Sequence, residues 1–178
     1  MEGDMFPTET AVRYLQDQTL ANFTTLRETI ITSDTFSPYA NYEGVAQALL
    51  AEGKYQESMH ALKALLPSGF LSFSLHSMLA YAHQKLGQTE EAQRELFYAK
   101  AAMRGILMTG DGSRDRPYQV LQIGDEYDVL RFFGKESIEQ TLIRTESESL
   151  DQHICRDGAV IWFDITVPSS MLRPGITS

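Results

Sequence analysis

The sequence predicts an α+β protein in which antiparallel helical hairpins are followed by a small antiparallel β-sheet with one short helix. The first observation is a repeat: residues 39–106 match themselves at an offset of 34 residues, a period typical of helix–turn–helix solenoids. The second is Asp157-Gly158 between two apolar stretches, a strong hairpin pattern. The third is the turn-rich segment 110–117, which separates the two kinds of pattern.

Two short helices are predicted before the repeats. Thr8-Glu9-Thr10 is a typical helix start for residues 11–18. A second helix follows Asn22, with apolar side chains at helical spacing: Phe23, Leu26, Ile30 and Ile31. Pro38 then fixes the entry into the repeats. We expect these helices to cap the array on the exposed face of the first repeat, because short arrays rarely stand alone.

The repeat itself predicts four helices in two antiparallel hairpins over residues 39–106. The identities at the offset are Ala46, Ala48, Gly53, Glu57 and Leu62, which recur as Ala80, Ala82, Gly87, Glu91 and Leu96. Alanines let helix backbones approach closely, and each glycine ends a first helix in the left-handed conformation. An ordinary pair of helical hairpins with a shared period is the alternative interpretation.

Residues 39–106 resemble tetratricopeptide repeats in this order of large, small and glycine positions. The resemblance implies a groove lined by the first helix of each repeat. Its lining in this chain would be Glu43, Gln47, Leu50, Ser77, Tyr81, Gln84 and Lys85. These residues include no basic pair that would clamp a peptide carboxylate, so we expect another kind of peptide or a helix as ligand.

The C-terminal part is predicted to be a small sheet with one helix. Residues 118–123 have strand length, and residues 125–133 form a helix with Asp125 as its cap and Gly134 at its end. Residues 138–156 and 159–167 are two β-stretches around the Asp157-Gly158 turn. Residues 1–109 and 110–178 would together form one compact unit.

A two-residue turn at Asp157-Gly158 would set the register of the hairpin. It pairs Ile154 with Ile161 and His153 with Trp162. The face expected to meet the core carries Leu150, Ile154, Ile161, Phe163 and Ile165, and the opposite face carries Asp151, His153, Cys155, Trp162 and Asp164.

Composition restricts the possible functions. The net charge is −9, with −4 in residues 1–38, zero in residues 39–106 and −5 in residues 107–178. This balance argues against nucleic acid as the main ligand, because phosphate binding needs a basic face. A basic protein partner, attracted by carboxylates such as Glu146 and Glu148, is favoured, although acidity can also serve solubility alone.

The chain is expected to be a cytoplasmic protein. The first ten residues lack the basic and apolar regions of a secretion signal, and no apolar run approaches the roughly 18 residues of a membrane span. Cys155 is the only cysteine, which excludes an internal disulfide and fits a reducing compartment. A removed signal peptide would instead allow a periplasmic origin.

Residues 22–167 also resemble a bacterial domain-of-unknown-function family with helical repeats followed by a small β cap. The resemblance lies in segment 26–33, in Phe36-Ser37-Pro38-Tyr39, in the Gly-Asp-Gly-Ser turn before Pro117, and in the strand 162–166. It implies the same fold and gives no activity.

The sequence predicts a non-enzymatic protein-binding module that acts through its helical repeats and acidic surface, without catalytic residues, cofactor or metal. One alternative is an immunity protein that neutralises a basic bacterial toxin or effector by binding it. A remote alternative is a hydrolase that uses Cys155 and His153, since a thiol and an imidazole are ingredients of nucleophilic catalysis. The oligomeric state and the identity of the partner stay open.

Overall fold

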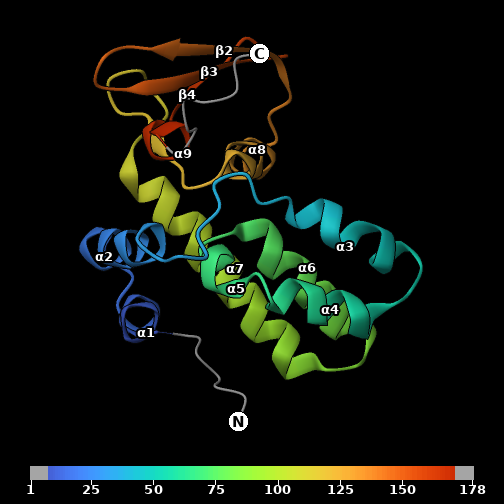
Figure 1. Cartoon of the computed structure of the whole chain (residues 1–178). Helices are drawn as coiled ribbons and strands as arrows, with labels where there is room; N and C mark the ends of the chain where they lie inside the picture. Colours follow the sequence, from blue (N-terminus) through green and yellow to red (C-terminus); the bar gives the residue numbers. More distant parts are fainter. Residues whose placement is uncertain (1–7, 171–178) are drawn as a thin grey trace, which may run out of the picture. The chain divides into compact units, whose positions relative to one another are not determined.

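The computed structural model describes residues 8–170 and confirms the α+β class. Helices α1 to α7 come first, and a four-stranded sheet with helices α8 and α9 follows (Figure 1). The chain divides into two compact units, residues 1–105 and 106–178. Each unit is described by itself below.

The two N-terminal helices begin at threonine caps. Helices α1 (Glu9–Gln16) and α2 (Leu20–Ile31) start where Thr8 and Thr19 side chains accept hydrogen bonds from backbone N–H groups. They contact α7 (Thr89–Thr109): the Tyr14 hydroxyl donates to the Ala101 carbonyl at 2.7 Å, and the Phe23 ring lies over Gly105. The expected position on the first repeat was therefore wrong, since these anchors belong to the second hairpin.

The repeat segment forms the predicted helical hairpins. Helices α3 (Tyr42–Ala51) and α4 (Tyr55–Lys63) make the first hairpin, and α6 (Phe73–Lys85) and α7 make the second. A short helix, α5 (Leu66–Gly69), joins the two hairpins. The four repeat helices are confirmed.

Helix α6 packs against both helices of the first hairpin. The three helices share a hydrophobic core, to which α6 contributes Leu75, Leu79 and Ala82. Opposite them lie Tyr42, Ala46, Met59 and Leu62 of α3 and α4. The space between α3 and α4 is thus closed by the first helix of the next hairpin.

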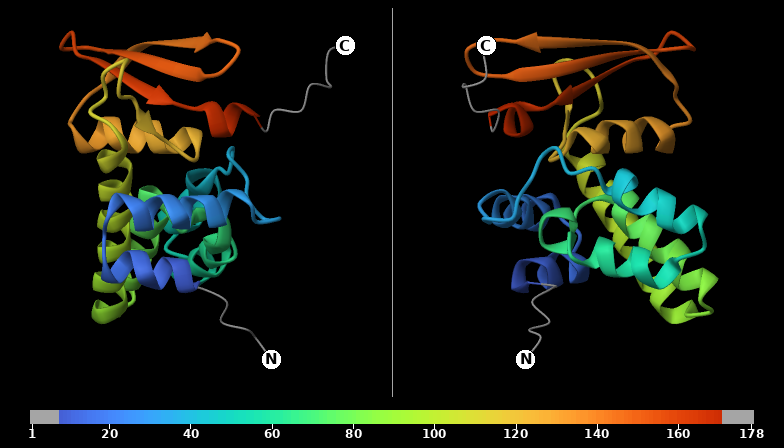
Figure 2. Two further views of the ribbon diagram at one scale, coloured as in Figure 1. Left: turned by 90° about the vertical axis from the view of Figure 1, so that its left-hand side faces the viewer. Right: turned by 45° about the vertical axis from the view of Figure 1, so that its right-hand side comes forward.

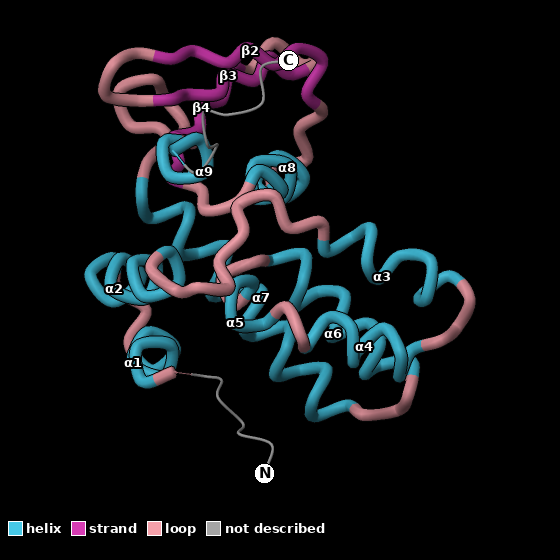
Figure 3. Tube along the Cα trace, viewed as in Figure 1, coloured by secondary structure: helices cyan, strands magenta, loops and turns pink. Residues whose placement is uncertain are grey.

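The sheet of the second unit has the strand order β1-β4-β3-β2. Strands β2, β3 and β4 are labelled in Figure 3. Its strands are β1 (Tyr118–Gln119), β2 (Ser137–Arg144), β3 (Ser149–Cys155) and β4 (Val160–Asp164). Strand β1 runs parallel to β4, whereas the other pairs are antiparallel. The sheet is mixed: the predicted antiparallel pairing holds for β2, β3 and β4, and β1 adds a parallel strand at the edge.

The predicted β-stretches are shorter than expected. Residues 138–156 contain two strands, because the chain turns at residues 145–148, where the Thr145 hydroxyl accepts the N–H groups of Ser147 and Glu148. Residues 118–123 keep only a two-residue strand, and the last predicted stretch ends at Asp164 before helix α9 (Thr166–Ser170).

Helix α8 (Ile123–Phe132) lies along one face of this sheet (Figure 2). It begins with a capping box in which the Asp125 carboxylate accepts the N–H of Gln122 at 2.9 Å. Asp125 is therefore in the first turn rather than at the cap position that we expected. Gly134 ends the helix with φ of 64°, as predicted.

The β3–β4 hairpin has a register that differs by one residue from the prediction. The loop contains three residues, Arg156, Asp157 and Gly158, so His153 pairs with Ile161 instead of Trp162. Gly158 has φ of 84°, and its N–H donates to the Cys155 carbonyl, as in a turn followed by a glycine bulge.

This shift turns over the side chains of β3, because a one-residue slip exchanges the two faces of a strand. The buried side chains of β3 now include Asp151, His153 and Cys155, which were predicted to face away from the core. Ile154 is only half-buried. Phe163 of β4 and Ile165, which follows the strand, are buried as expected.

Candidate functional site

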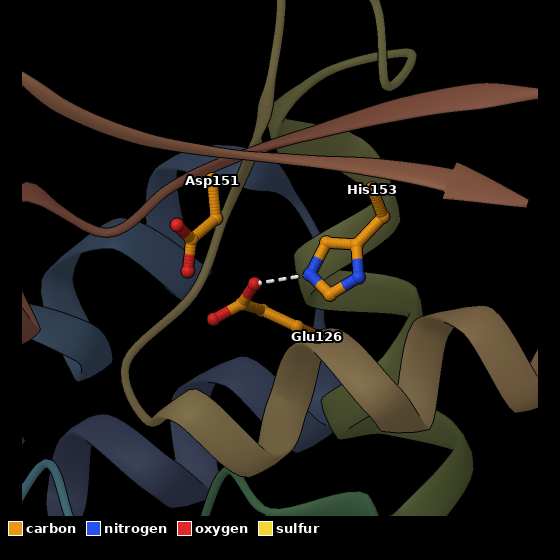
Figure 4. A group of neighbouring side chains, drawn as sticks. All are labelled: Glu126, Asp151 and His153. Atoms are coloured by element: carbon orange, nitrogen blue, oxygen red, sulfur yellow. Dashed lines mark hydrogen bonds and ion pairs between the residues drawn. The ribbon is translucent and has the colours of Figure 1, made fainter. Parts of the chain in front are cut away.

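A histidine and two carboxylates from different elements meet inside the second unit (Figure 4). Glu126 points from α8 toward the sheet, and Asp151 and His153 point from β3 toward the helix. One potential ligand atom of each residue lies within 4.8 Å of the others. The three residues expose 0%, 4% and 0% of their surface, respectively.

The hydrogen bonds of His153 fix its ring. The Ser137 hydroxyl donates to the Glu139 carbonyl at 3.2 Å, so it accepts the proton of His153 Nδ1 at 2.9 Å. The Nε2 atom lies 2.8 Å from Glu126 Oε2. Nδ1 therefore carries a proton. Nε2 either shares a proton with the carboxyl group of Glu126 or is unprotonated and can bind a metal ion.

Asp151 is held by an outer chain of hydrogen bonds. Gln140 Nε2 donates to Asp151 Oδ2 at 2.8 Å, and the Tyr127 hydroxyl donates to Gln140 Oε1 at 2.8 Å. The second oxygens are different. Glu126 Oε1 and Asp151 Oδ1 are buried and have no hydrogen-bond partner.

The electrostatics of this cluster reflect its burial. Desolvation raises the pKa of Glu126 to about 7; the hydrogen bond with His153 opposes this shift, and the negative charge of Asp151 adds to it. Negative charge is therefore unfavourable at this position unless a proton or another cation compensates it.

Cys155 lies on the same face of β3, but its geometry does not support nucleophilic catalysis. Both nitrogens of His153 are occupied, by Ser137 and Glu126, so the imidazole does not contact the thiol. Burial also raises the pKa of Cys155, and the Asp157 carboxylate raises it further, which is opposite to thiol activation.

A groove lies between α6 and α7 in the helical unit. Its volume is about 350 Å³, and it is lined by Ser77, Ala80, Tyr81, Gln84, Thr89, Ala92, Gln93 and Leu96. Three of the predicted binding residues, Ser77, Tyr81 and Gln84, line this groove.

The other predicted binding residues do not line it. Lys85 places its ammonium group 5.2 Å from the centre of the Tyr81 ring. Glu43, Gln47 and Leu50 lie on α3, where the first two are exposed and Leu50 packs at the edge of the core. Glu146 and Glu148 lie in the β2–β3 turn, beside a shallow hollow of about 220 Å³ that residues of α9 also line.

These observations define an α+β protein with helical hairpins and a separate sheet unit. The chain belongs to the family described as Domain of unknown function (DUF4919), whose model matches residues 33–171. The resemblance to a domain-of-unknown-function family is thereby confirmed, whereas no tetratricopeptide family model matches. No curated protein and no solved structure matches the chain. Within residues 8–170, every helix is too short or too polar to cross a membrane.

Proposed function

We propose that this protein is a non-enzymatic, tetratricopeptide-like module that binds a helix of another protein in the groove between α6 and α7. The observation that supports it most is a difference between two equivalent leucines. Leu62 and Leu96 occupy the same position of the repeat, yet Leu62 is fully buried and Leu96 is 45% exposed.

Repeat equivalence identifies the kind of occupant. In the first hairpin, the apolar face of α6 covers Leu62 of α4 and Ala46 of α3. The corresponding position in the second hairpin is the open groove, with Leu96 and Ala80 in its lining. An amphipathic helix with spacing like that of α6 would fit there, as in other helix-in-groove complexes.

The chemistry of the lining favours reversible binding. Gln84 and Gln93 stand where the first repeat has Leu50 and Met59, so amides replace two apolar groups. Terminal repeats need such polarity to stay soluble. The lining contains no charged residue, and the amides can bond to polar groups flanking an apolar anchor.

Tyr81 provides a preorganised aromatic contact. The Tyr55 ring meets it edge-on at 6.2 Å between ring centres, and the Lys85 ammonium lies over it. A ring held in this way loses little freedom when a partner binds, which favours affinity. The expected partner helix therefore presents an apolar residue between Tyr81 and Leu96.

The proposal is tested by photo-crosslinking in cells that naturally produce the protein. A benzophenone amino acid is placed at Gln93 in the groove, and, as a matched control, at Phe97, which is exposed one helical turn away and does not line the groove. We expect a crosslink from position 93 alone, mapped by mass spectrometry to a helical segment of a different protein. Equal crosslinks from both positions, or crosslinks only to a second copy of this chain, would contradict the proposal.

A further inference from the structure

We propose that Glu126, Asp151 and His153 form a binding site for one divalent first-row transition-metal ion, for which Zn²⁺ is the probe. Among residues 8–170, these three are the group of histidine and acidic side chains whose ligand atoms lie close enough to hold an ion together. The site is separate from the helical groove and independent of the function proposed for it.

The two unpartnered oxygens point to a missing cation. Glu126 Oε1 and Asp151 Oδ1 belong to side chains that are at least nine-tenths buried, and neither atom accepts a hydrogen bond. Buried polar atoms nearly always have a hydrogen-bond partner. An exception calls for a further partner such as an ion. A divalent cation among the three residues would compensate both carboxylates at once.

The ligand set selects the kind of metal. One imidazole nitrogen with two carboxylates suits zinc, manganese or iron, whereas calcium and magnesium prefer oxygen ligands throughout. Around tetrahedral zinc, with bonds of about 2.0–2.2 Å, neighbouring ligand atoms lie about 3.3 Å apart. The 2.8 Å between His153 Nε2 and Glu126 Oε2 would widen slightly, and the wider separations within the group would shorten.

The surrounding hydrogen bonds prepare the ligands for a metal. Ser137 accepts the Nδ1 proton of His153 and so directs the Nε2 lone pair toward Glu126. Gln140 holds one oxygen of Asp151 and leaves the other for coordination. Outer partners of this kind orient ligands in metal sites and commonly change affinity by about 10–100-fold when removed.

An ion has a short route to these ligands. Gln140 is exposed, and Tyr127 exposes 41% of its surface, while both are linked to Asp151. Movement of these two side chains would open the cluster to solvent without unfolding the sheet. Entry and exit of the ion would then depend on movement of these two side chains.

The test is metal content and affinity of the full chain. The protein is stripped with a chelator, loaded with Zn²⁺, and dialysed; zinc is then measured by mass spectrometry, and the dissociation constant by competition with a chromogenic chelator. We expect about one zinc per chain. The isosteric variants Glu126→Gln and Asp151→Asn should lose it, and Ser137→Ala should weaken binding about 10–100-fold.

Glu95→Gln is the matched control. His76 and Glu95 form another buried histidine–carboxylate pair, with 2.6 Å between His76 Nδ1 and Glu95 Oε2. However, His76 Nε2 is already bonded to the Phe70 carbonyl. Among residues 8–170, no second carboxylate completes a metal-binding group with this pair. This variant should keep the zinc. Circular dichroism checks the fold of every variant.

Cobalt substitution keeps the test decisive if a variant fails to fold. Wild-type protein loaded with Co²⁺ should show visible absorption bands of a nitrogen- and oxygen-ligated ion, and one equivalent of Zn²⁺ should abolish them. Absence of retained zinc and of the cobalt bands in the wild type would overturn the proposal. Retention by the two carboxamide variants as tight as in the wild type would also overturn it.

Discussion

Gly53 and Gly87 end the first helix of successive hairpins in the same left-handed conformation, with φ of 74° and 73°. The N–H of the following residue donates back to the helix in both places: Lys54 to the Leu49 carbonyl at 2.8 Å and Gln88 to the His83 carbonyl at 2.9 Å. The two hairpins thus share one helix-ending geometry at positions 34 residues apart, as the period predicts.

Replacing Gly87 by alanine should destabilise the helical unit through backbone conformation alone. An added Cβ would meet no atom within 4 Å, so the cost is the left-handed φ, about 1–2 kcal/mol. Gly124→Ala is the control, because Gly124 lies inside α8 with equal space and an ordinary φ, where alanine stabilises a helix by up to about 1 kcal/mol. Urea unfolding should give opposite signs for the two variants.

The docking of α2 on α7 predicts a steric effect at Gly105. A Cβ at this position would lie 2.2 Å from Cδ2 and Cε2 of the Phe23 ring, so Gly105→Ala should cost about 1–3 kcal/mol of unfolding free energy. Adding Phe23→Leu should make the double variant more stable than the sum of the single effects predicts. Additive losses in thermal melting would show that the ring does not lie over Gly105.

Tyr14 predicts a loss of stability at alkaline pH. Burial raises its pKa from 10 to about 12, and Arg104 partly opposes this shift. Because the folded pKa is above the unfolded one, its contribution is complete below pH 10 and is lost as the pH rises toward 12. Stability should fall by up to about 1.4 kcal/mol per pH unit in this range.

The control for this titration is Tyr14→Phe, which keeps the ring and removes the hydroxyl that donates to Ala101. It should lower stability at neutral pH by about 1 kcal/mol and flatten the alkaline slope. An unchanged slope in denaturant titrations between pH 10 and 12 would assign the effect to other groups.

The acidic β2–β3 turn is predicted to assist the encounter with a basic partner. Glu146 and Glu148 are exposed there, so their charges act at long range and salt screens them over about 10 Å at 0.1 M. The association rate should fall as salt rises and fall again in the variant Glu146→Lys with Glu148→Lys, while dissociation changes less. A rate insensitive to both, in surface plasmon resonance, would leave solubility as the role of this charge.

The helical part could be predicted from local sequence, whereas the sheet could not. Glycine at the end of a helix has one physical meaning, so Gly53 and Gly87 located the hairpins. Asp157-Gly158 is ambiguous, because two- and three-residue loops both place glycine at positive φ. This difference of one residue in loop length decides which face of β3 is buried. The contact of Asp151 and His153 with Glu126 of α8 could therefore not be predicted from the sequence.

The burial of Glu126 follows a recognisable sequence pattern. It lies three and four residues before Val129 and Leu130, on the apolar face of α8, and all three are buried. A charged residue on such a face needs a partner in the core. The partner was not predictable, because it comes from a strand whose register depends on the β3–β4 loop.

Binding in the groove between α6 and α7 is tested by comparing Leu96→Arg with Phe97→Arg. The affinity of each variant for the partner crosslinked at position 93 is measured by isothermal titration calorimetry. Leu96 and Phe97 are each 45% exposed, but only Leu96 lines the groove. We predict that Leu96→Arg weakens binding by at least about 30-fold, equivalent to about 2 kcal/mol, and that Phe97→Arg changes it less than about threefold. Equal affinities for the two variants would contradict the proposed binding site.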